Sequence, residues 1–177
     1  MHNQSDNSDQ PGLLHYAVVV AAVVLLSVVI FHFLLGTSMR AIESGSMEPN
    51  MRVGDIVIIR DVPRFGIVTY QDGAISGYES FGEFGDVVLY RKYGRNGETP
   101  IIHRAMYYVD AGEPMWDEGP PAPHAGYITR GDNNAYSDQY CKICREPVRE
   151  EWVIGVARFR VPYAGYVRFV CLRILGG

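Results

Sequence analysis

The longest apolar run of the chain lies near its start. Residues 13–35 read LLHYAVVVAAVVLLSVVIFHFLL, 23 positions without Asp, Glu, Lys or Arg. As a helix rising 1.5 Å per residue, the run would reach roughly 34 Å, more than the bilayer's hydrocarbon core of about 30 Å. A cleaved signal peptide is the alternative, but such a leader has a basic start, a shorter apolar stretch and a small-x-small cleavage site. The pattern therefore predicts a transmembrane anchor over residues 13–35, preceded by a disordered polar tail over residues 1–12.

After residue 35 the pattern changes to short runs rich in β-branched and aromatic residues. Gly, Pro, Asn and Asp separate these runs at short intervals, which is typical of strands joined by turns. The runs are residues 56–59, 66–70, 86–90, 101–103, 107–109, 127–129 and 152–157. This pattern predicts a mainly β fold, with a β-barrel or sheet domain over residues 36–165 behind one N-terminal transmembrane helix.

Three stretches do not follow the strand pattern. Residues 73–84 (GAISGYESFGEF) and 111–125 (AGEPMWDEGPPAPHA) contain many turn residues and are predicted to be loops or insertions. Residues 166–177 are apolar but short, and two arginines interrupt them. We expect this last segment to lie on a membrane surface or against the core rather than to span a bilayer.

Composition narrows the classes of function. The net charge is −4, and the 16 basic residues form no stripe, so no nucleic-acid partner is expected. Only Lys92 and Lys142 are lysines, which limits where a lysine could act as a base. Of the three cysteines, Cys141 and Cys144 form a C-x-x-C that supplies two ligands, whereas a closed zinc site takes four. A local disulfide or two free thiols is the favoured interpretation over a metal or redox site, and no cofactor is expected.

Candidate chemistry begins in the stretch AIESGSMEPN, residues 41–50. Two serines flank a glycine ahead of a proline, and Met47 is unusually large and apolar for a turn. A serine hydroxyl becomes a nucleophile when a base removes its proton. The stretch is therefore either a turn or the position of a nucleophilic serine.

A base and an acid for such a serine are present further along the chain. His103 follows a strand-like run, whereas His124 lies in a Pro-rich loop where we expect it to be solvated, so His103 is the favoured base. Asp132 and Asp138 both follow the run at 127–129, and either could orient an imidazole. A core histidine and Asx-turn aspartates are the alternative interpretations.

Several short motifs stand in a definite order along the chain. They are SGSMEP at 44–49 followed by RVGDIV at 52–57, GDVVLY at 85–90, IIHR at 101–104, GDNN at 131–134 with Asp138, and GVA at 155–157 with VPY at 161–163. Each motif alone is weak, but together they resemble the type I signal peptidases of the archaeal and endoplasmic-reticulum branch. The resemblance covers residues 13–165.

The resemblance implies a catalytic role for four residues. Ser46 would be the nucleophile, and His103 would be the general base and later the general acid. Asp138 would be the acidic partner of the imidazole, and Asp132 would support the site. Either aspartate could bond to His103, because both lie in one loop.

The resemblance also implies the surroundings of the nucleophile. The Ser44 hydroxyl would form an oxyanion hole with the Ser46 backbone N–H. Met47 would line the substrate pocket and face the scissile segment and the lipid surface. Bacterial members of the family use a lysine base, but neither Lys92 nor Lys142 stands at the matching position.

The implied function is that of a membrane-bound serine endopeptidase that removes signal peptides from exported preproteins after small residues in an A-x-A pattern. Its partners would be preprotein signal peptides, the lipid bilayer, and a translocon or accessory subunits. The catalytic domain would stand on the extracytoplasmic face of the cell membrane behind a single span. Arg40 and Arg52 after the apolar run favour the opposite side by the positive-inside rule, but two residues are a weak signal.

Two other functions agree with the same motifs. One is a membrane-tethered binding or assembly module that has this fold but does not hydrolyse peptides. The other is a processing protease dedicated to one surface protein.

Overall fold

The computed structural model describes residues 13–35 and 38–165, with side chains described over 15–31 and 38–165. The chain divides into two compact units, Met1–Gly36 and Thr37–Gly177. The predicted tail at 1–12 and the apolar segment at 166–177 lie outside the described residues. The first unit contains helix α1, and the second contains every strand in the described part of the chain.

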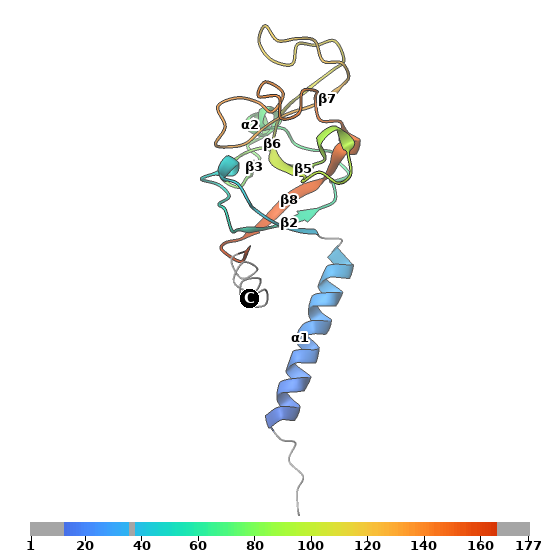
Figure 1. Ribbon diagram of the computed structural model, residues 1–177, viewed down its shortest axis with the longest axis vertical. Helices are drawn as coiled ribbons and strands as arrows, with labels where there is room; N and C mark the ends of the chain where they lie inside the picture. The colour runs from blue at the N-terminus through green and yellow to red at the C-terminus, as the bar shows by residue number, and fades with distance from the viewer. Residues whose placement is uncertain (1–12, 36–37, 166–177) are drawn as a thin grey trace, which may run out of the picture. The chain divides into compact units, whose positions relative to one another are not determined.

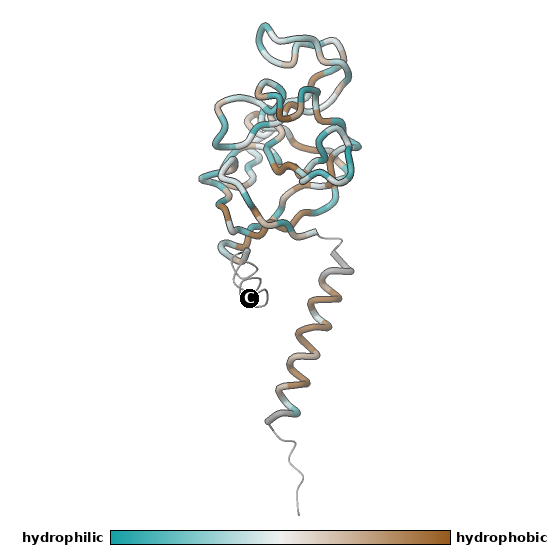
Figure 2. The backbone as a smooth tube through the Cα atoms, in the orientation of Figure 1, coloured by the Kyte–Doolittle hydropathy of each residue, from teal (hydrophilic) through white to brown (hydrophobic). Residues whose placement is uncertain are grey.

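Helix α1 (Leu13–Leu35) forms over the long apolar run. Figure 2 shows apolar residues along most of its described length. Within the described residues, of which 15–31 are the part of α1 with side chains, no helix is both long and apolar enough to cross a membrane. The transmembrane anchor over residues 13–35 therefore stays a prediction.

The second unit is built on one six-stranded antiparallel sheet (Figure 1). Its spatial order is β1-β2-β8-β5-β6-β7, and every hydrogen-bonded pair of neighbours is antiparallel. The strands are β1 (Ser38–Ala41), β2 (Ile56–Arg60), β5 (Val87–Tyr90), β6 (Ile101–Val109), β7 (Gly126–Arg130) and β8 (Val153–Val161). The predicted mainly β fold is confirmed as an open sheet, because the edge strands β1 and β7 do not pair with each other in the described part of the chain.

The smaller elements correct several expectations. The run at 66–70 is not a strand, and the runs at 101–103 and 107–109 belong to the single strand β6. Residues 73–84 are not a plain loop, since they contain the end of a helix and a two-stranded ribbon. These elements are α2 (Tyr70–Ser76), β3 (Glu79–Ser80) and β4 (Glu83–Phe84), with one-turn 3₁₀ helices η1 (Gly45–Met47), η2 (Lys92–Gly94) and η3 (Glu150–Trp152).

Strand β5 lies in the middle of the core, and all four of its side chains are buried. Because side chains alternate along a strand, Val87 and Leu89 lie on one face and Val88 and Tyr90 lie on the other. Val87 and Leu89 belong to one apolar cluster, whereas Val88 and Tyr90 belong to a second. The sheet is thus covered on both faces at this strand.

The Gly-Asp pairs at 54–55 and 85–86 place buried carboxylates at turns. Asp55 accepts the Arg52 N–H at 2.9 Å and pairs with Arg160 at 3.3 Å. Asp86 accepts the Val68 N–H at 3.0 Å, the Tyr78 hydroxyl at 2.9 Å and the Arg158 guanidinium at 2.9 Å. Both motifs therefore hold the turns before β2 and β5 rather than supplying chemistry.

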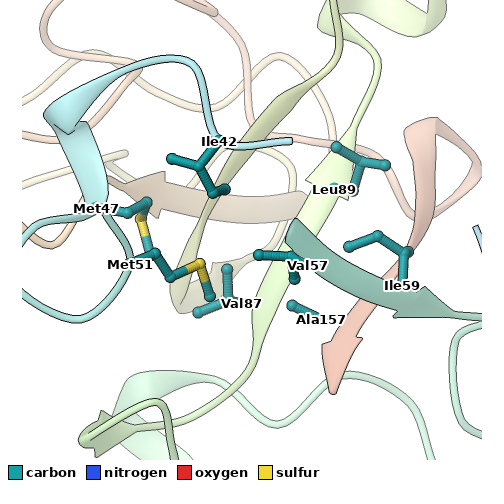
Figure 3. Packing of buried hydrophobic residues seen from close by; sticks show 8 residues of the cluster. All are labelled: Ile42, Met47, Met51, Val57, Ile59, Val87, Leu89 and Ala157. Carbon is teal, nitrogen blue, oxygen red and sulfur yellow. The ribbon is translucent and has the colours of Figure 1, made fainter. Parts of the chain in front are cut away.

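The segment that carries Ser46 is anchored in the apolar cluster that contains Val87 and Leu89. Met47, in η1, and Met51, just after it, are both fully buried and lie side by side next to Val57 and Val87 (Figure 3). The backbone N–H of Met51 also donates to the Met47 carbonyl at 2.8 Å. The turn around Ser46 is therefore fixed by two apolar side chains that point into the core.

We expect Met51→Ala to lower the free energy of unfolding by about 2–5 kcal/mol, because truncating a fully buried methionine leaves a cavity. The measurement is urea unfolding of the purified full-length chain, followed by tryptophan fluorescence. Met39→Ala is the matched control: Met39 is 57 % exposed, so its truncation should change the free energy by no more than about 0.5 kcal/mol. Equal effects of the two substitutions would contradict the anchoring role of Met51.

Candidate active site

Ser46 borders a cavity of about 670 Å³ in the second unit. Its walls include residues 39–41 of β1 and 101–103 of β6, together with residues 42–44 and 47 on either side of Ser46. Each of these two strand segments pairs on one side only within the described structure, β1 with β2 and residues 101–103 with β5. The remaining lining residues are Leu89, Thr99, Pro100, Asn134 and Ile143.

Ser46 and His103 both line this cavity and lie next to each other. The Ser46 Oγ lies 3.0 Å from the His103 Nε2, although 57 positions separate them in the sequence. Ser46 is half-buried and His103 is buried at 4 % exposure. A serine oxygen within hydrogen-bond reach of an imidazole nitrogen is the arrangement in which the imidazole can remove the hydroxyl proton.

The second nitrogen of the imidazole faces Asp138. His103 Nδ1 lies 2.7 Å from Asp138 Oδ2 and 2.8 Å from Oδ1. The Asp138 side chain is fully buried and accepts two further hydrogen bonds, from the Tyr90 hydroxyl at 2.7 Å and the Thr129 hydroxyl at 2.6 Å. Because the carboxylate accepts from Nδ1–H, Nε2 is left as the acceptor that faces Ser46.

Strand register brings these groups together. In β6 His103 lies opposite Val88, and Ala105 lies opposite Thr129 of β7. Directly opposite residues and residues two apart share a sheet face, so His103, Thr129 and Tyr90 project to one side. Asp138 reaches them from the loop after β7, where its N–H donates to the Thr129 carbonyl at 2.8 Å.

Burial changes the acid–base behaviour of Tyr90. Its pKa is raised well above the ordinary value, first because burial disfavours the phenolate and then because the Asp138 charge lies beside it. A bond from Thr129 opposes this shift only in part. Tyr90 therefore stays a protonated donor to Asp138 across the physiological range.

Asp132 lies outside this chain of bonds. Its two carboxylate oxygens accept from Nε and Nη2 of Arg104, both at 2.8 Å, and Oδ2 also accepts from the Asn50 amide at 2.9 Å. The Arg104 and Asp132 side chains are only 2 % and 6 % exposed. The choice that the sequence left open is thus decided by geometry: Asp138 bonds to His103, and Asp132 ties β6 to the segment after Ser46.

The loop after β7 also makes hydrogen bonds to the turn that carries Ser46. The Asn133 backbone N–H donates to the Ser46 carbonyl at 2.9 Å, and its side-chain amide donates to the Gly45 carbonyl at 3.1 Å. A Cβ at Gly131 would lie 2.6 Å from the Ser46 carbonyl oxygen and 2.9 Å from His103 Nε2. Only glycine allows this approach, so part of the GDNN motif serves close packing of the loop against Ser46 and His103.

Sequence reasoning missed four of these contributors, namely Arg104, Tyr90, Thr129 and Asn133. Arg104 Nη1 lies within hydrogen-bond distance of four backbone carbonyls, those of Ser80, Glu83, Phe84 and Gly85. Its position next to His103 in the IIHR motif was a usable signal, because a charged residue inside an apolar strand needs a partner when buried. Tyr90 and Thr129 gave no such signal, since both are ordinary strand residues.

Ser44 and Met47 both border the cavity, but they do so differently. The exposed Ser44 hydroxyl lies 3.2 Å from the Ser46 hydroxyl. Met47 has no exposed surface and packs in the core. The expectation that Met47 faces a lipid surface is therefore wrong, whereas its predicted place beside the substrate pocket stays a prediction.

The other candidates from the sequence lie away from Ser46. His124 is not solvated as expected: its Nε2 lies 3.1 Å from Glu146, and its side chain is 14 % exposed. Lys92 sits beside Tyr93 in η2, and no lysine lines the cavity in the described structure. Neither lysine is therefore placed to act as the base for Ser46.

The two cysteines of the C-x-x-C are free thiols, so the disulfide interpretation is not the one found. Cys141 is exposed, whereas Cys144 is buried, and its burial raises the pKa of the thiol. Ile143, between them, lines the cavity, and its N–H donates to the Asp138 carbonyl at 2.9 Å. No group of three or more His, Cys, Asp or Glu suited to hold a metal ion occurs in the described part of the chain.

Comparison with known proteins gives one consistent result. No family model matches the chain. Among curated proteins, it is 31% identical over 126 residues to the signal peptidase complex catalytic subunit SEC11 of Colletotrichum graminicola, and 29% identical over 133 residues to that of Aspergillus oryzae. Each alignment covers 70% of this chain and 58% or 60% of the relative, respectively. The subunit of Aspergillus fumigatus is 27% identical over 173 residues, which is 92% of this chain and 80% of that protein.

The chain spans about 60% of the length of the first two relatives, so their whole activity and assembly are not carried over by similarity alone. The predicted resemblance is nevertheless confirmed by several curated proteins of the same name. The chain is thus similar to the catalytic subunits of signal peptidase complexes, which agrees with the predicted resemblance to type I signal peptidases.

Proposed function

We propose that this protein is a membrane-bound serine endopeptidase that removes signal peptides from exported preproteins. The observation that carries the proposal is the continuous hydrogen-bonded chain Ser46–His103–Asp138 beside the cavity. The similarity of the protein to catalytic subunits of signal peptidase complexes supports the proposed class of reaction.

In the first step, Ser46 Oγ attacks the scissile carbonyl while His103 Nε2 takes its proton. The imidazolium that forms donates its Nδ1–H to Asp138, which stabilises the new charge without taking the proton. When the tetrahedral intermediate collapses, the C–N bond breaks and Nε2–H protonates the leaving amine. A water then attacks the Ser46 ester while His103 Nε2 takes its proton. The ester C–O bond breaks, Nε2–H returns the proton to Ser46 Oγ, and the carboxylic acid product leaves.

The oxyanion of each tetrahedral intermediate needs donors beside Ser46 Oγ. We assign this role to the Ser46 backbone N–H and the Ser44 hydroxyl. Ser46 is the second residue of η1 and lies ahead of the positions whose N–H can bond within that helix, so its N–H is left for another acceptor. The Ser44 hydroxyl, 3.2 Å from Ser46 Oγ, can rotate toward the oxyanion, and such a donor is worth about 10²–10³ in rate.

The cavity suits an extended peptide. Strand β1 and residues 101–103 of β6 both border the cavity and both leave one edge unpaired within the described structure. A substrate strand would add to these edges, so that backbone hydrogen bonds give affinity and side-chain pockets give selectivity. Ile42 and Ile143 are among the apolar residues that line the cavity, which supports cleavage after small residues in the A-x-A pattern.

The membrane and partner assignments are part of the same proposal. The 23-residue apolar helix α1 would anchor the chain by a single span, with the catalytic domain on the extracytoplasmic face of the cell membrane. The relatives' names call them subunits of a complex, which supports accessory subunits as partners here. A translocon is a further partner in the proposal.

The proposal predicts that Ser46, His103 and Asp138 act together, so that loss of any one removes most of the activity. Ser46→Ala, His103→Ala and Asp138→Ala should each lower cleavage of a labelled preprotein by on the order of 10⁴-fold, and the triple variant should be scarcely worse than the worst single one. The assay uses the detergent-solubilised full-length chain. Ser76→Ala, which alters an exposed serine of α2, is the control and should leave the rate unchanged.

Two results would redirect the proposal. A folded wild type that cuts no preprotein would make the non-catalytic binding or assembly module the leading function. A wild type that cuts one surface protein but no other member of a panel of unrelated preproteins would favour the dedicated processing protease.

The second prediction concerns pH. Nε2 must be unprotonated to accept the Ser46 proton, so activity should fall on the acid side as the imidazole gains a proton. In His103→Lys the imidazole is replaced by an amine, which is the stronger base, so any residual activity should appear only at more alkaline pH than in the wild type. A wild-type rate that stays constant down to about pH 5 would argue against a histidine base.

The third prediction concerns topology. In sealed vesicles of defined orientation, added protease should digest residues 38–165 only when the extracytoplasmic face is outward. An epitope tag on the N-terminus should show the opposite protection and serves as the internal control. A catalytic domain protected on the outward extracytoplasmic face would reverse the proposed orientation, in agreement with the weak charge signal of Arg40 and Arg52.

A further inference from the structure

Tyr90 is a buried polar side chain that the proposed reaction does not use. It is fully buried at the end of β5, and its ring belongs to the apolar cluster that includes Val88, Val148 and Cys144. Its hydroxyl donates to Asp138 Oδ2 at 2.7 Å. A phenol with no polar partner would prefer water, so the cost of burying this hydroxyl is offset by its short bond to the carboxylate and by a longer one, 3.4 Å, from the Thr129 hydroxyl.

The environment of Asp138 shows what this bond does. Oδ2 lies within hydrogen-bond distance of three groups, namely the Tyr90 hydroxyl, the Thr129 hydroxyl at 2.6 Å and His103 Nδ1 at 2.7 Å. The two hydroxyls come from β5 and β7, which lie on either side of β6, the strand that carries His103. The carboxylate is therefore held from both neighbouring strands at the point where it faces the imidazole.

We infer that Tyr90 is a positioning residue for the proposed peptidase reaction, acting through Asp138 on the orientation and basicity of His103. The inference rests on the proposed function for its kinetic consequences, but the coupling between Tyr90 and His103 exists whatever the reaction. Tyr90 does not line the cavity and has no route to the substrate. Thr129 is the second hydroxyl of the same arrangement.

The direction of the effect follows from electrostatics. A hydrogen bond to a carboxylate stabilises its charge and draws electron density away from its other partners. When the Tyr90 hydroxyl is removed, Asp138 attracts the Nδ1–H of His103 more strongly, which favours the imidazolium. The titratable groups near Asp138 are His103 on β6, Tyr90 on β5 and Cys144 in the loop after β7. Cys144 is unchanged by the substitution and stays a buried thiol.

The test compares Tyr90→Phe with Tyr107→Phe in the full-length chain. The Tyr107 hydroxyl also donates a 2.7 Å bond, but to the Met115 carbonyl in the loop after β6, away from the site. Tyr90→Phe should lower kcat about tenfold with KM unchanged, because Asp138 loses a bond that holds it in position toward His103, while the cavity is not touched. Tyr107→Phe should leave both constants at the wild-type values.

A second readout does not require activity. NMR titration of the His103 imidazole, assigned by its loss in His103→Gln, should show a midpoint about half a pH unit higher in Tyr90→Phe than in the wild type. The midpoint in Tyr107→Phe should not move. An unchanged midpoint in Tyr90→Phe, or an equal change in Tyr107→Phe, would overturn the inference.

The two readouts separate this inference from the proposed function. A midpoint that moves in a protein without peptidase activity would reject the function and keep the coupling. An active wild type whose His103 midpoint and kcat are both insensitive to Tyr90→Phe would keep the function and reject the coupling.

Two further variants complete the test. Thr129→Val, nearly isosteric, removes the other hydroxyl and should move the midpoint in the same direction, which tests the arrangement even where Tyr90→Phe fails to fold. In an Asp138→Asn background, Tyr90→Phe should have no further effect on the midpoint, because the group through which it acts is already neutral. An undiminished shift in that background would show that Tyr90 acts by another route.

Discussion

The rest of the site depends on keeping a fully buried carboxylate satisfied. An ionised side chain without partners in a protein interior is costly enough that it takes up a proton instead. Asp138 avoids this cost because donors from three adjacent strands converge on it: Tyr90 from β5, His103 from β6 and Thr129 from β7. The three donors share a face only in the observed register of these strands. The register of the sheet therefore determines whether the site can form.

The second aspartate of the same loop shows the division between chemistry and support. Asp132 also has little exposure, but its partner Arg104 carries a permanent charge and holds it in a two-point bond. The same guanidinium reaches the backbone of the β3–β4 ribbon. Removing either member would leave the other as an unpaired buried charge, a loss of about 3–5 kcal/mol for such pairs. The ion pair of Asp132 with Arg104 thus fixes the loop after β7 in addition to the bond between Asp138 and His103.

Sequence reasoning predicted the strands whose runs of β-branched and aromatic residues lie between turn residues, and it predicted the residue types of the candidate site. It failed at the run 66–70 because the backbone there is satisfied outside any ladder: the Val68 N–H bonds to the Asp86 side chain, and Thr69 caps α2. It could not choose between Asp132 and Asp138, since only tertiary structure separates their partners. Tyr90 was beyond reach for the same reason, because a tyrosine in a strand is ordinary until its hydroxyl is seen beside a carboxylate.

Unpaired strand edges are a liability that most proteins cover or charge. Here the two edges, β1 and the start of β6, border the same cavity, and Ser46 lines it as well. Met47 and Met51 fix the turn that carries Ser46 by packing in the core, and Asn133 fixes it by a hydrogen bond from the loop after β7. The Ser46 oxygen is therefore held in place without a bound substrate, while the unpaired hydrogen-bonding groups of the edges are what the proposed peptide substrate would use. An extended chain is the occupant that satisfies both edges, which is why the arrangement favours peptide-bond chemistry over the binding of a small compact ligand.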